Sequence, residues 1–319
     1  MDNIQKLKNI LTDFTDEIEY IFDIPLNKAF IAATYILSNK NLPYLGNVSK
    51  EANETINSYY QDFKKMEYTP YEMRRAFNEA YLMSLRDMKE YTVNVTLELP
   101  LLYLRMITDL IASHMEYEHI NILNASANIG SLSLALALSE HINPRDLYVT
   151  VNTEEELRIA SNLRDLSGFE YPIQDVLPAL SFRTDIIVSD PFLRKAEDIL
   201  VFFEDYIEYL NLNGFMIITL PTEYVRSRIF SDSLEDHSLV LIGLIEYPKD
   251  LLGGLIDSSI VILEKKDTTN KEFFHISMSS IKDIESNIKI MDEIKKYINE
   301  YLGDKWKWKL CQSTADHQV

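Results

Sequence analysis

The chain has 319 residues, of which 46% are hydrophobic and 25% charged, and this composition is typical of a globular protein. No stretch approaches the roughly 18 uninterrupted apolar residues that a membrane span needs, so we expect no membrane contact. The formal net charge of −19 makes tight binding to duplex DNA doubtful, because nucleic-acid binders concentrate positive charge. The basic clusters are short, at Arg74-Arg75, Arg194-Lys195 and Arg226/Arg228. The acidic balance is also typical of a solvated surface that keeps a protein soluble.

The cysteine and histidine residues indicate the redox state of the cellular compartment and whether a metal site is expected. Cys311 is the single cysteine, which excludes an intrachain disulfide and is typical of a reducing compartment. The first residues show no basic segment followed by an apolar core, so we expect no signal peptide and a cytoplasmic location. The histidines have no metal-ligand spacing with one another or with the cysteine, and we expect no metal site.

The first 115 residues are predicted to be helical. Apolar residues recur at three- and four-residue spacing from Ile4 to Ile18, and further helices are expected after Pro25 and over residues 51–66. Thr69-Pro70 is a helix start signal, with threonine as the N-cap and proline at the first helical position. We therefore predict a helical N-terminal domain over residues 1–115, and we expect a protein partner, if there is one, to contact this domain.

From His119 onwards, strands alternate with helices. Residues 120–138 combine a short apolar strand, a loop that contains Gly130, and an apolar helix expected over residues 131–140. This pattern is typical of the first βα turn of a nucleotide-binding sheet, where backbone approaches a ligand. Further strands are predicted at 147–151, 184–188, 214–220, 240–246 and 258–263, and helices at 154–166, at 197–210 and from Thr222.

Near-continuous apolar strands between helices predict a mostly parallel sheet that is covered on both faces. The last two strands are joined by a connection too short for a helix, so we expect them to form an antiparallel pair at one edge. The predicted fold class is therefore α/β, with a Rossmann-like domain over residues 116–311 and a polar tail over residues 312–319.

Four segments of this domain resemble the adenine-specific DNA methyltransferases, a branch of the class I S-adenosylmethionine-dependent methyltransferases. The loop from Asn124 to Gly130 resembles their cofactor loop, and the segment from Tyr148 to Glu154 stands where the family has a strand that ends in a ribose-binding acidic residue. Asp175 stands where the family contacts the adenine of the cofactor, and Ser189-Asp190-Pro191-Phe192 resembles the catalytic loop. The chain is also similar, roughly from Asp62 to Lys265, to the YtxK-type methyltransferase-like proteins of Gram-positive bacteria.

The resemblance implies S-adenosylmethionine as the cofactor and a set of residues for its site. The residues implied in cofactor binding are Asn124, Ser126, Gly130, Thr150 and Asp175, and those implied in catalysis are Ser189, Asp190, Pro191 and Phe192. In the adenine enzymes, the corresponding catalytic loop accepts hydrogen bonds from the exocyclic amine and stacks its ring on the extruded base.

Several residues depart from the family pattern. Asn124 and Thr150 replace carboxylates, and Asn128 replaces a glycine, so that a Cβ intrudes on ligand space. Each lost charge-assisted contact is worth about 1.5–3 kcal/mol, so we predict weak binding of S-adenosylmethionine. Two functions stay open. One is methyl transfer to an amine nitrogen, and the other is a catalytically inactive methyltransferase-fold protein that acts through protein or ligand binding.

The catalytic loop also has two interpretations. Asp190 lies at the carboxyl end of a central strand, where α/β proteins place their chemistry. An Asp-Pro pair also turns the chain off a strand without any further role, and Phe192 is equally consistent with packing in the core. We predict that Asn124, Thr150, Asp175 and Asp190 lie at one edge of the sheet.

Overall fold

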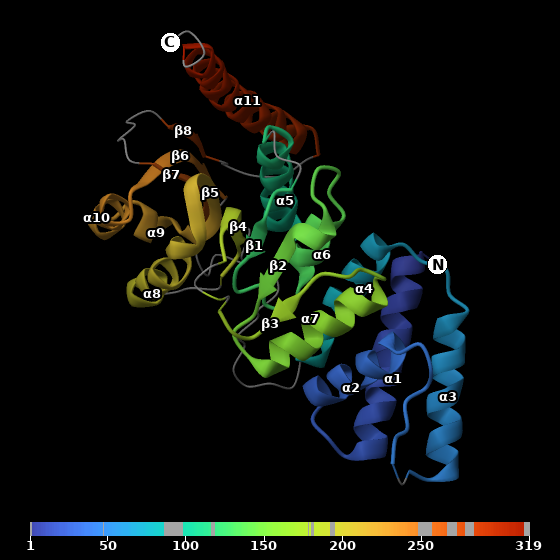
Figure 1. Ribbon diagram of the computed structural model, residues 1–319. Helices are drawn as coiled ribbons and strands as arrows, with labels where there is room; N and C mark the ends of the chain where they lie inside the picture. The colour runs from blue at the N-terminus through green and yellow to red at the C-terminus, as the bar shows by residue number, and fades with distance from the viewer. Residues whose placement is uncertain are drawn as a thin grey trace.

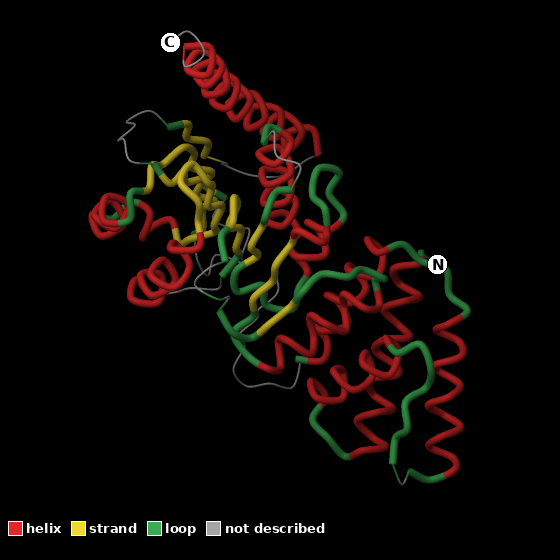
Figure 2. Tube along the Cα trace, viewed as in Figure 1, coloured by secondary structure: helices red, strands yellow, loops and turns green. Residues whose placement is uncertain are grey.

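The computed structural model describes residues 2–46, 48–85, 98–115, 119–177, 179, 182–191, 195–247, 257–266, 273–277 and 284–315, with side chains in the last range for residues 287–303. Four N-terminal helices gather at one end of the molecule, the sheet lies in the middle, and the last helix leaves at the opposite end (Figures 1 and 2). Among the helices that the structure describes, none is long and apolar enough to cross a membrane.

The N-terminal helices share one core with two helices of the sheet region. They are α1 (Asn3–Phe22), α2 (Leu26–Ser38), α3 (Lys50–Lys64) and α4 (Pro70–Ser84). Their buried apolar side chains pack with Leu134 of α6 (Ser131–Ala137) and with Ile159 and Leu163 of α7 (Glu154–Leu166). The start signal at Thr69-Pro70 is confirmed, because Thr69 and Glu72 form a reciprocal capping box at the first turn of α4.

Within the residues that the structure describes, the sheet has eight strands in the order β3-β2-β1-β4-β5-β7-β6-β8. Pairing is parallel from β3 to β5, β7 runs antiparallel to both of its neighbours, and β8 is parallel to β6. The predicted α/β fold is therefore confirmed. The strands are β1 (Ile122–Asn124), β2 (Leu147–Thr150), β3 (Ile173–Gln174), β4 (Thr184–Ser189), β5 (Leu210–Pro221), β6 (Leu239–Glu246), β7 (Ser258–Lys265) and β8 (Phe274–Ser277).

Several element boundaries differ from the prediction. The antiparallel pair is confirmed, but β8 lies outside it, so the pair does not form the edge. The helix expected at 131–140 ends at Ala137, and the one expected at 197–210 ends at Tyr206 as α8 (Ala196–Tyr206). Strand β5 begins at Leu210, before the predicted start at 214, and its register against β4 shifts between the pairs Thr184–Leu210 and Ile186–Phe215. Gly214 lies within this irregular part of β5, where a Cβ would lie 2.9 Å from the carbonyl oxygen of Asp185.

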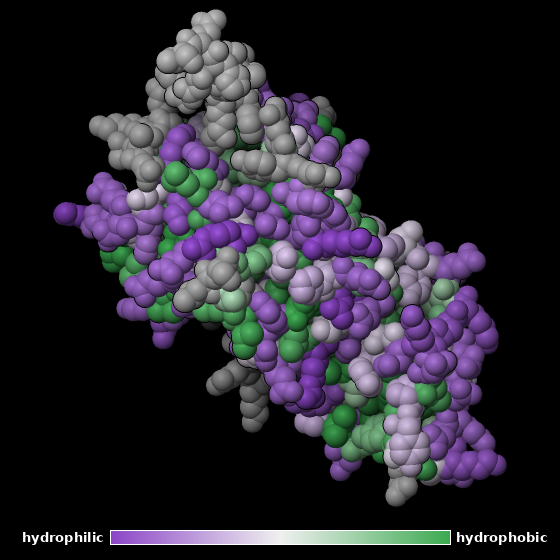
Figure 3. All heavy atoms as spheres, in the orientation of Figure 1, coloured by the Kyte–Doolittle hydropathy of each residue, from purple (hydrophilic) through white to green (hydrophobic). Residues whose placement is uncertain are grey.

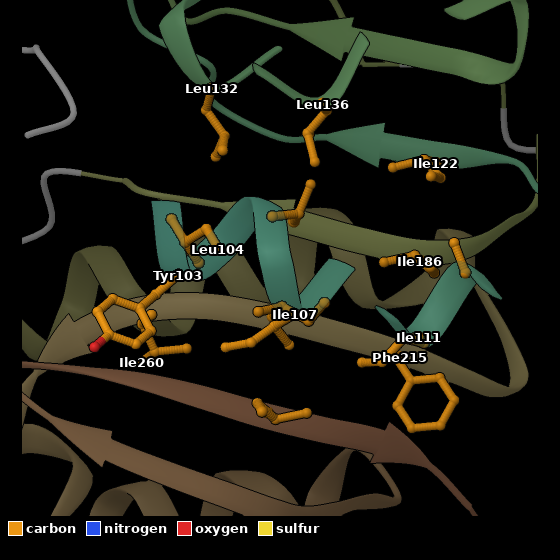
Figure 4. Close-up of a cluster of buried hydrophobic side chains, with 14 of the residues drawn as sticks. Tyr103, Leu104, Ile107, Ile111, Ile122, Leu132, Leu136, Ile186, Phe215 and Ile260 are labelled. Atoms are coloured by element: carbon orange, nitrogen blue, oxygen red, sulfur yellow. The ribbon is translucent and has the colours of Figure 1, made fainter. Parts of the chain in front are cut away.

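Helix α5 (Glu98–Ser113) covers one face of the sheet, and α11 (Ile284–Ala315) packs against α5. Figure 4 shows Leu104 and Ile107 of α5 facing buried side chains of the sheet such as Ile186. Helix α5 thus packs on the sheet, although it lies within the range predicted as the N-terminal domain, and α11 enters the range predicted as a polar tail. The domain boundaries at 115 and 311 stay predictions. Helices α9 (Thr222–Val225) and α10 (Arg228–Asp236) complete the sheet region.

Candidate functional site

The carboxyl ends of β1 to β4 bring the predicted site residues to one edge. Asn124, Thr150 and Asp190 end or follow β1, β2 and β4, and Asp175 follows β3 directly. Because these strands pair in parallel, their carboxyl ends meet at the same edge of the sheet. The predicted placement is therefore confirmed, while the roles of the residues stay predictions.

Asn124 is fully buried and makes its hydrogen bonds inside the protein. Its Nδ2 donates to the carbonyl oxygen of Val188 on β4 over 3.0 Å, and its Oδ1 accepts from the Ser133 hydroxyl on α6 over 2.6 Å. Both ends of the amide are thus engaged. The side chain ties β1 to β4 and α6.

The loop between β1 and α6 is tied down on two sides. Ser126 has a φ of 50°; its N–H donates to the Thr150 hydroxyl over 3.3 Å, and its own hydroxyl donates to Oδ1 of Asn152 over 3.0 Å. Asn128 has a φ of 51°, and its Nδ2 donates to the carbonyl oxygen of Asp190 over 3.1 Å. Both side chains are buried. The Asn128 amide therefore bridges the β1 and β4 ends of the edge.

Gly130 lets α6 approach α7 closely. Its φ is 85°, and a Cβ at this position would lie 3.0 Å from Cβ and 3.2 Å from Cα of Ala160. Only glycine has both the backbone freedom and the small size that this contact requires. The next residue, Ser131, donates its hydroxyl to Oδ1 of Asn78 on α4, so the start of α6 also contacts the N-terminal helices.

Thr150 and Ser189 are buried and already partnered. The Thr150 hydroxyl shares a hydrogen bond of 3.1 Å with the Tyr206 hydroxyl of α8, and its carbonyl oxygen accepts from the Ala127 N–H over 2.7 Å. The Ser189 hydroxyl donates to the carbonyl oxygen of Ala125. These bonds join neighbouring strand ends, so both side chains serve to close the edge.

Asp190 is half-buried, Pro191 is buried, and Phe192 lies outside the described residues. The Tyr247 hydroxyl is buried and has no hydrogen-bond partner in the described part of the chain. Its pKa is raised well above 10, first by burial and then by the Asp190 charge. The ring of Tyr103 lies 6.3 Å from that of Tyr247, and burial raises the pKa of Tyr103 to about 12. Two neutral phenols therefore lie on the β4–β6 side of the edge. No sequence signal separated them from ordinary core tyrosines.

The β2–β3 side of the edge is different, because its polar groups face solvent. Asn152 and Asp175 are exposed, and they follow adjacent strands that are joined by the hydrogen bond from the Val151 N–H to the Gln174 carbonyl oxygen. Val176 and Leu177 are 63% and 44% exposed. An accessible carboxylate thus lies next to apolar surface.

These residues fit only part of S-adenosylmethionine. The ammonium of the methionine part needs an accessible acceptor, but Asn124 is buried and engaged, and the Asn128 amide spans the loop. The exposed Asp175 carboxylate is suited to an amine or hydroxyl donor. The β1–β4 side therefore does not fit the cofactor, and no catalytic step through it follows. Within the described part of the chain, no three His, Cys, Asp or Glu side chains converge as metal ligands.

Several solved structures with the same architecture are described as methyltransferases. A candidate class I S-adenosylmethionine-dependent methyltransferase from Listeria monocytogenes matches with a TM-score of 0.77 at 17% identity, over 92% of this chain and 98% of the other. The methyltransferase subunit of a type I restriction-modification system from Streptococcus thermophilus matches with a TM-score of 0.60 at 14% identity, over 89% and 73%.

A modification subunit of a candidate type I restriction enzyme from Vibrio vulnificus matches with a TM-score of 0.53 at 13% identity, over 80% of this chain and 60% of the other. No protein-family model and no curated protein sequence matches the chain. Strand order and structural similarity agree with the resemblance inferred from the sequence. The chain has the fold of the class I S-adenosylmethionine-dependent methyltransferases.

Proposed function

We propose that this chain is a methyltransferase-fold protein that acts by binding and does not transfer methyl groups. The observation that carries the proposal is that the buried polar side chains at the ends of β1 and β2 and in the loop after β1 are already hydrogen-bonded within the protein. Asn124, Asn128 and Thr150 each bond to a neighbouring strand end or helix, so a cofactor would have to break these contacts first. Replacing protein contacts of this kind by ligand contacts gives little net binding energy.

Calorimetric titration of the purified chain with S-adenosylmethionine and S-adenosylhomocysteine tests this proposal. Two missing charge-assisted contacts of about 1.5–3 kcal/mol each move a micromolar ligand towards the millimolar range, since about 1.4 kcal/mol is a tenfold change. We therefore expect dissociation constants far above the micromolar range. A low-micromolar constant would contradict the proposal and support an active enzyme.

A second candidate function is methyl transfer from S-adenosylmethionine to an amine nitrogen. It is favoured by the half-buried Asp190 followed by the buried Pro191 at the end of β4. In this function the Asp190 carboxylate orients the amine. If an acceptor becomes labelled in the presence of methyl-labelled cofactor, Asp190→Ala should abolish the label and leave cofactor affinity within about twofold, because the loss is at the acceptor and not at the cofactor.

Tight binding to duplex DNA is not part of the proposed function. The net charge is −19, and Arg74, Arg75, Arg226 and Arg228 each pair with a carboxylate that a DNA phosphate would first have to displace. Arg194 lies outside the described residues. Tight nonspecific binding needs several cations that are available to phosphates. Anisotropy titration at low salt should show no submicromolar affinity, and a submicromolar constant with steep salt dependence would contradict this expectation.

The partner that we propose is a protein that contacts the N-terminal helices. Hydrophilic residues cover most of the face in Figure 3, and apolar residues emerge between them in separate patches. A groove between α2 and α7 has Ile31, Ala32 and Leu157 among its lining residues, with Tyr35 52% exposed beside them. An apolar floor with a polar rim suits an amphipathic segment of a protein. A photo-crosslinking residue at position 35 should capture one defined partner, and the same residue at the exposed Tyr44 should not.

A further inference from the structure

A second polar cluster lies at the junction of α4 and α5, away from the strand ends. Arg74 of α4 has a side chain that is only 2% exposed. Its guanidinium forms a bidentate salt bridge with the Glu98 carboxylate, with Nη1 3.0 Å from Oε2 and Nη2 2.8 Å from Oε1. The Arg74 Nε is buried and has no hydrogen-bond partner among the residues that the structure describes. The guanidinium therefore has donor capacity that Glu98 does not use.

Glu98 is much more accessible than the arginine that holds it. It is the first residue of α5, and its side chain is 40% exposed. A carboxylate with this exposure can leave its partner without opening the core. Arg74, which is enclosed, would then keep a charge that needs another anion.

The surroundings of this pair carry additional positive charge. The Tyr71 ring lies 5.4 Å from the Arg74 guanidinium carbon and 6.0 Å from that of Arg75. Arg75 approaches Glu79 only at 3.9 Å, and Glu79 is shared with Lys8 at 3.1 Å. Among the described side chains, Arg74, Arg75 and Lys8 thus pair with two carboxylates, those of Glu98 and Glu79. Arg75 is a second guanidinium beside Arg74, and it holds its carboxylate only loosely.

We propose that Arg74 and Arg75 form an oxyanion-binding site in which Glu98 is an internal ligand that an external carboxylate or phosphate group displaces. The planar fork of arginine binds both kinds of oxyanion with two parallel hydrogen bonds. The exposed part of Glu98 gives the external group its route of entry. This site lies apart from the strand-end residues and does not require methyl transfer.

Displacement of Glu98 has a structural consequence. Glu98 attaches the first turn of α5 to α4, and Asn78, one turn beyond Arg74, holds Ser131 at the start of α6. Helix α5 also carries Tyr103, whose ring contacts Tyr247 at the carboxyl edge. An anion bound to Arg74 would release α5 from α4 at a point that is connected to this edge.

The test compares anion binding by the unmodified full chain and by Glu98→Ala, with inorganic phosphate and acetate as probes at constant ionic strength in chloride. Isothermal titration should give at least tenfold tighter binding to Glu98→Ala, because the internal competitor is gone. Adding Arg74→Met to Glu98→Ala should abolish this binding. Whichever probe binds more tightly identifies the oxyanion that the site prefers.

A matched control removes a carboxylate from an exposed pair. Glu154→Ala frees Arg158, which is 63% exposed, and should gain no anion affinity. Glu98→Gln serves if Glu98→Ala does not fold, since it keeps the shape and removes the charge. Equal affinities in the unmodified chain, the Glu98 variants and the double variant would overturn the proposal, as would the absence of binding to both Glu98 variants.

Discussion

The two halves of the carboxyl edge use their polar residues in opposite ways. In the buried half, at the ends of β1, β2 and β4 and in the loop after β1, Asn124, Asn128 and Thr150 are buried and bonded to other parts of the protein. In the exposed half, just beyond the ends of β2 and β3, Asn152 and Asp175 are exposed. All of these residues occupy strand ends or the loops that follow them. Position at the carboxyl edge therefore does not by itself make a residue available to a ligand.

The difference comes from what covers each strand end. Helix α6 places Ser133 over the end of β1, and α8 brings the Tyr206 hydroxyl to Thr150. Strand β3 has only two residues and lies at the outer edge of the sheet, where fewer elements surround it. Polar groups in the buried half of the edge must bond to one another, because burying them unpaired costs free energy.

The largest expected effect is on the free energy of unfolding, through the packing of α6 against α7 next to the buried half of the edge. Gly130→Ala adds a Cβ at 3.0 Å from Ala160 Cβ and at a φ of 85°. Left-handed strain of about 1–2 kcal/mol and overpacking of about 1–3 kcal/mol should together lower the free energy of unfolding by about 2–5 kcal/mol. Gly168→Ala is the control, because its φ is 74° but nothing lies within 4 Å of its Cβ. Equal losses in urea unfolding would show that Gly130 has no packing role.

Asn124→Asp restores the carboxylate that the family resemblance expects at this position. The new carboxyl would be fully buried and would face the Val188 carbonyl oxygen, which is an acceptor. Burial raises the pKa of the folded carboxyl, so the folded state keeps a proton that the unfolded chain releases as pH rises above about 4. Stability should therefore fall with rising pH, with a loss of about 2–3 kcal/mol at pH 8 and less at pH 5.

Asn152→Asp is the matched control for that prediction. It makes the same chemical change at the exposed end of β2, and the carboxylate can still accept from Ser126. We expect a change within about 0.5 kcal/mol, as for most surface substitutions. Urea unfolding of both variants at the two pH values measures the difference. A pH-independent loss at position 124 would contradict the buried environment inferred for Asn124.

Thr150→Val tests the bonds between β2, the loop and α8. The substitution removes the hydroxyl that accepts from the Ser126 N–H and bonds with Tyr206. It leaves buried polar groups without partners, and we expect a loss of about 1–2 kcal/mol. Thr219→Val is the control, because the Thr219 hydroxyl is buried without a partner among the described residues and its removal should be close to neutral. A double-mutant cycle with Tyr206→Phe should give a coupling near 1 kcal/mol, and zero coupling would mean that this bond is absent in solution.

The sequence predicted the fold well because its signals are local. The apolar strand, the loop with Gly130 and the following helix are adjacent in the chain, and so are the cap residues of α4. The sequence did not predict β8, which is a short edge strand, or the long helix α11. A four-residue strand has too short a pattern to separate it from a loop.

The site was only half predictable for a different physical reason. Parallel strands force Asn124 and Asp175 to the same edge, and this follows from strand direction alone. Whether a side chain is engaged depends on contacts between distant segments, such as Asn128 with Asp190 and Thr150 with Tyr206. No spacing rule reports such contacts. The bidentate pair of Arg74 with Glu98 could not be predicted for the same reason.

The smallest expected effect on stability comes from a substitution in the exposed half of the edge. Asp175 is exposed, so Asp175→Ala should change the free energy of unfolding by less than about 0.5 kcal/mol. Asp185→Ala is the contrasting variant, because that carboxylate accepts from the Asn121 N–H over 3.0 Å and from Asn211 over 2.9 Å. Its loss should cost about 1–3 kcal/mol, since both donors stay partly buried without a partner.

The same Asp175 variant sharpens the comparison through ligand binding. If S-adenosylhomocysteine still binds weakly at the exposed half, Asp175→Ala should weaken this binding about tenfold or more. A charged acceptor contributes about 1.5–3 kcal/mol. Asn124→Ala should leave that affinity within about threefold, because the Asn124 amide is already hydrogen-bonded to Val188 and Ser133. Calorimetric titration of both variants separates the two halves. If Asn124→Ala weakened binding more than Asp175→Ala, the buried half would be the one that contacts the ligand. The assignment of ligand access to the exposed half would then be wrong.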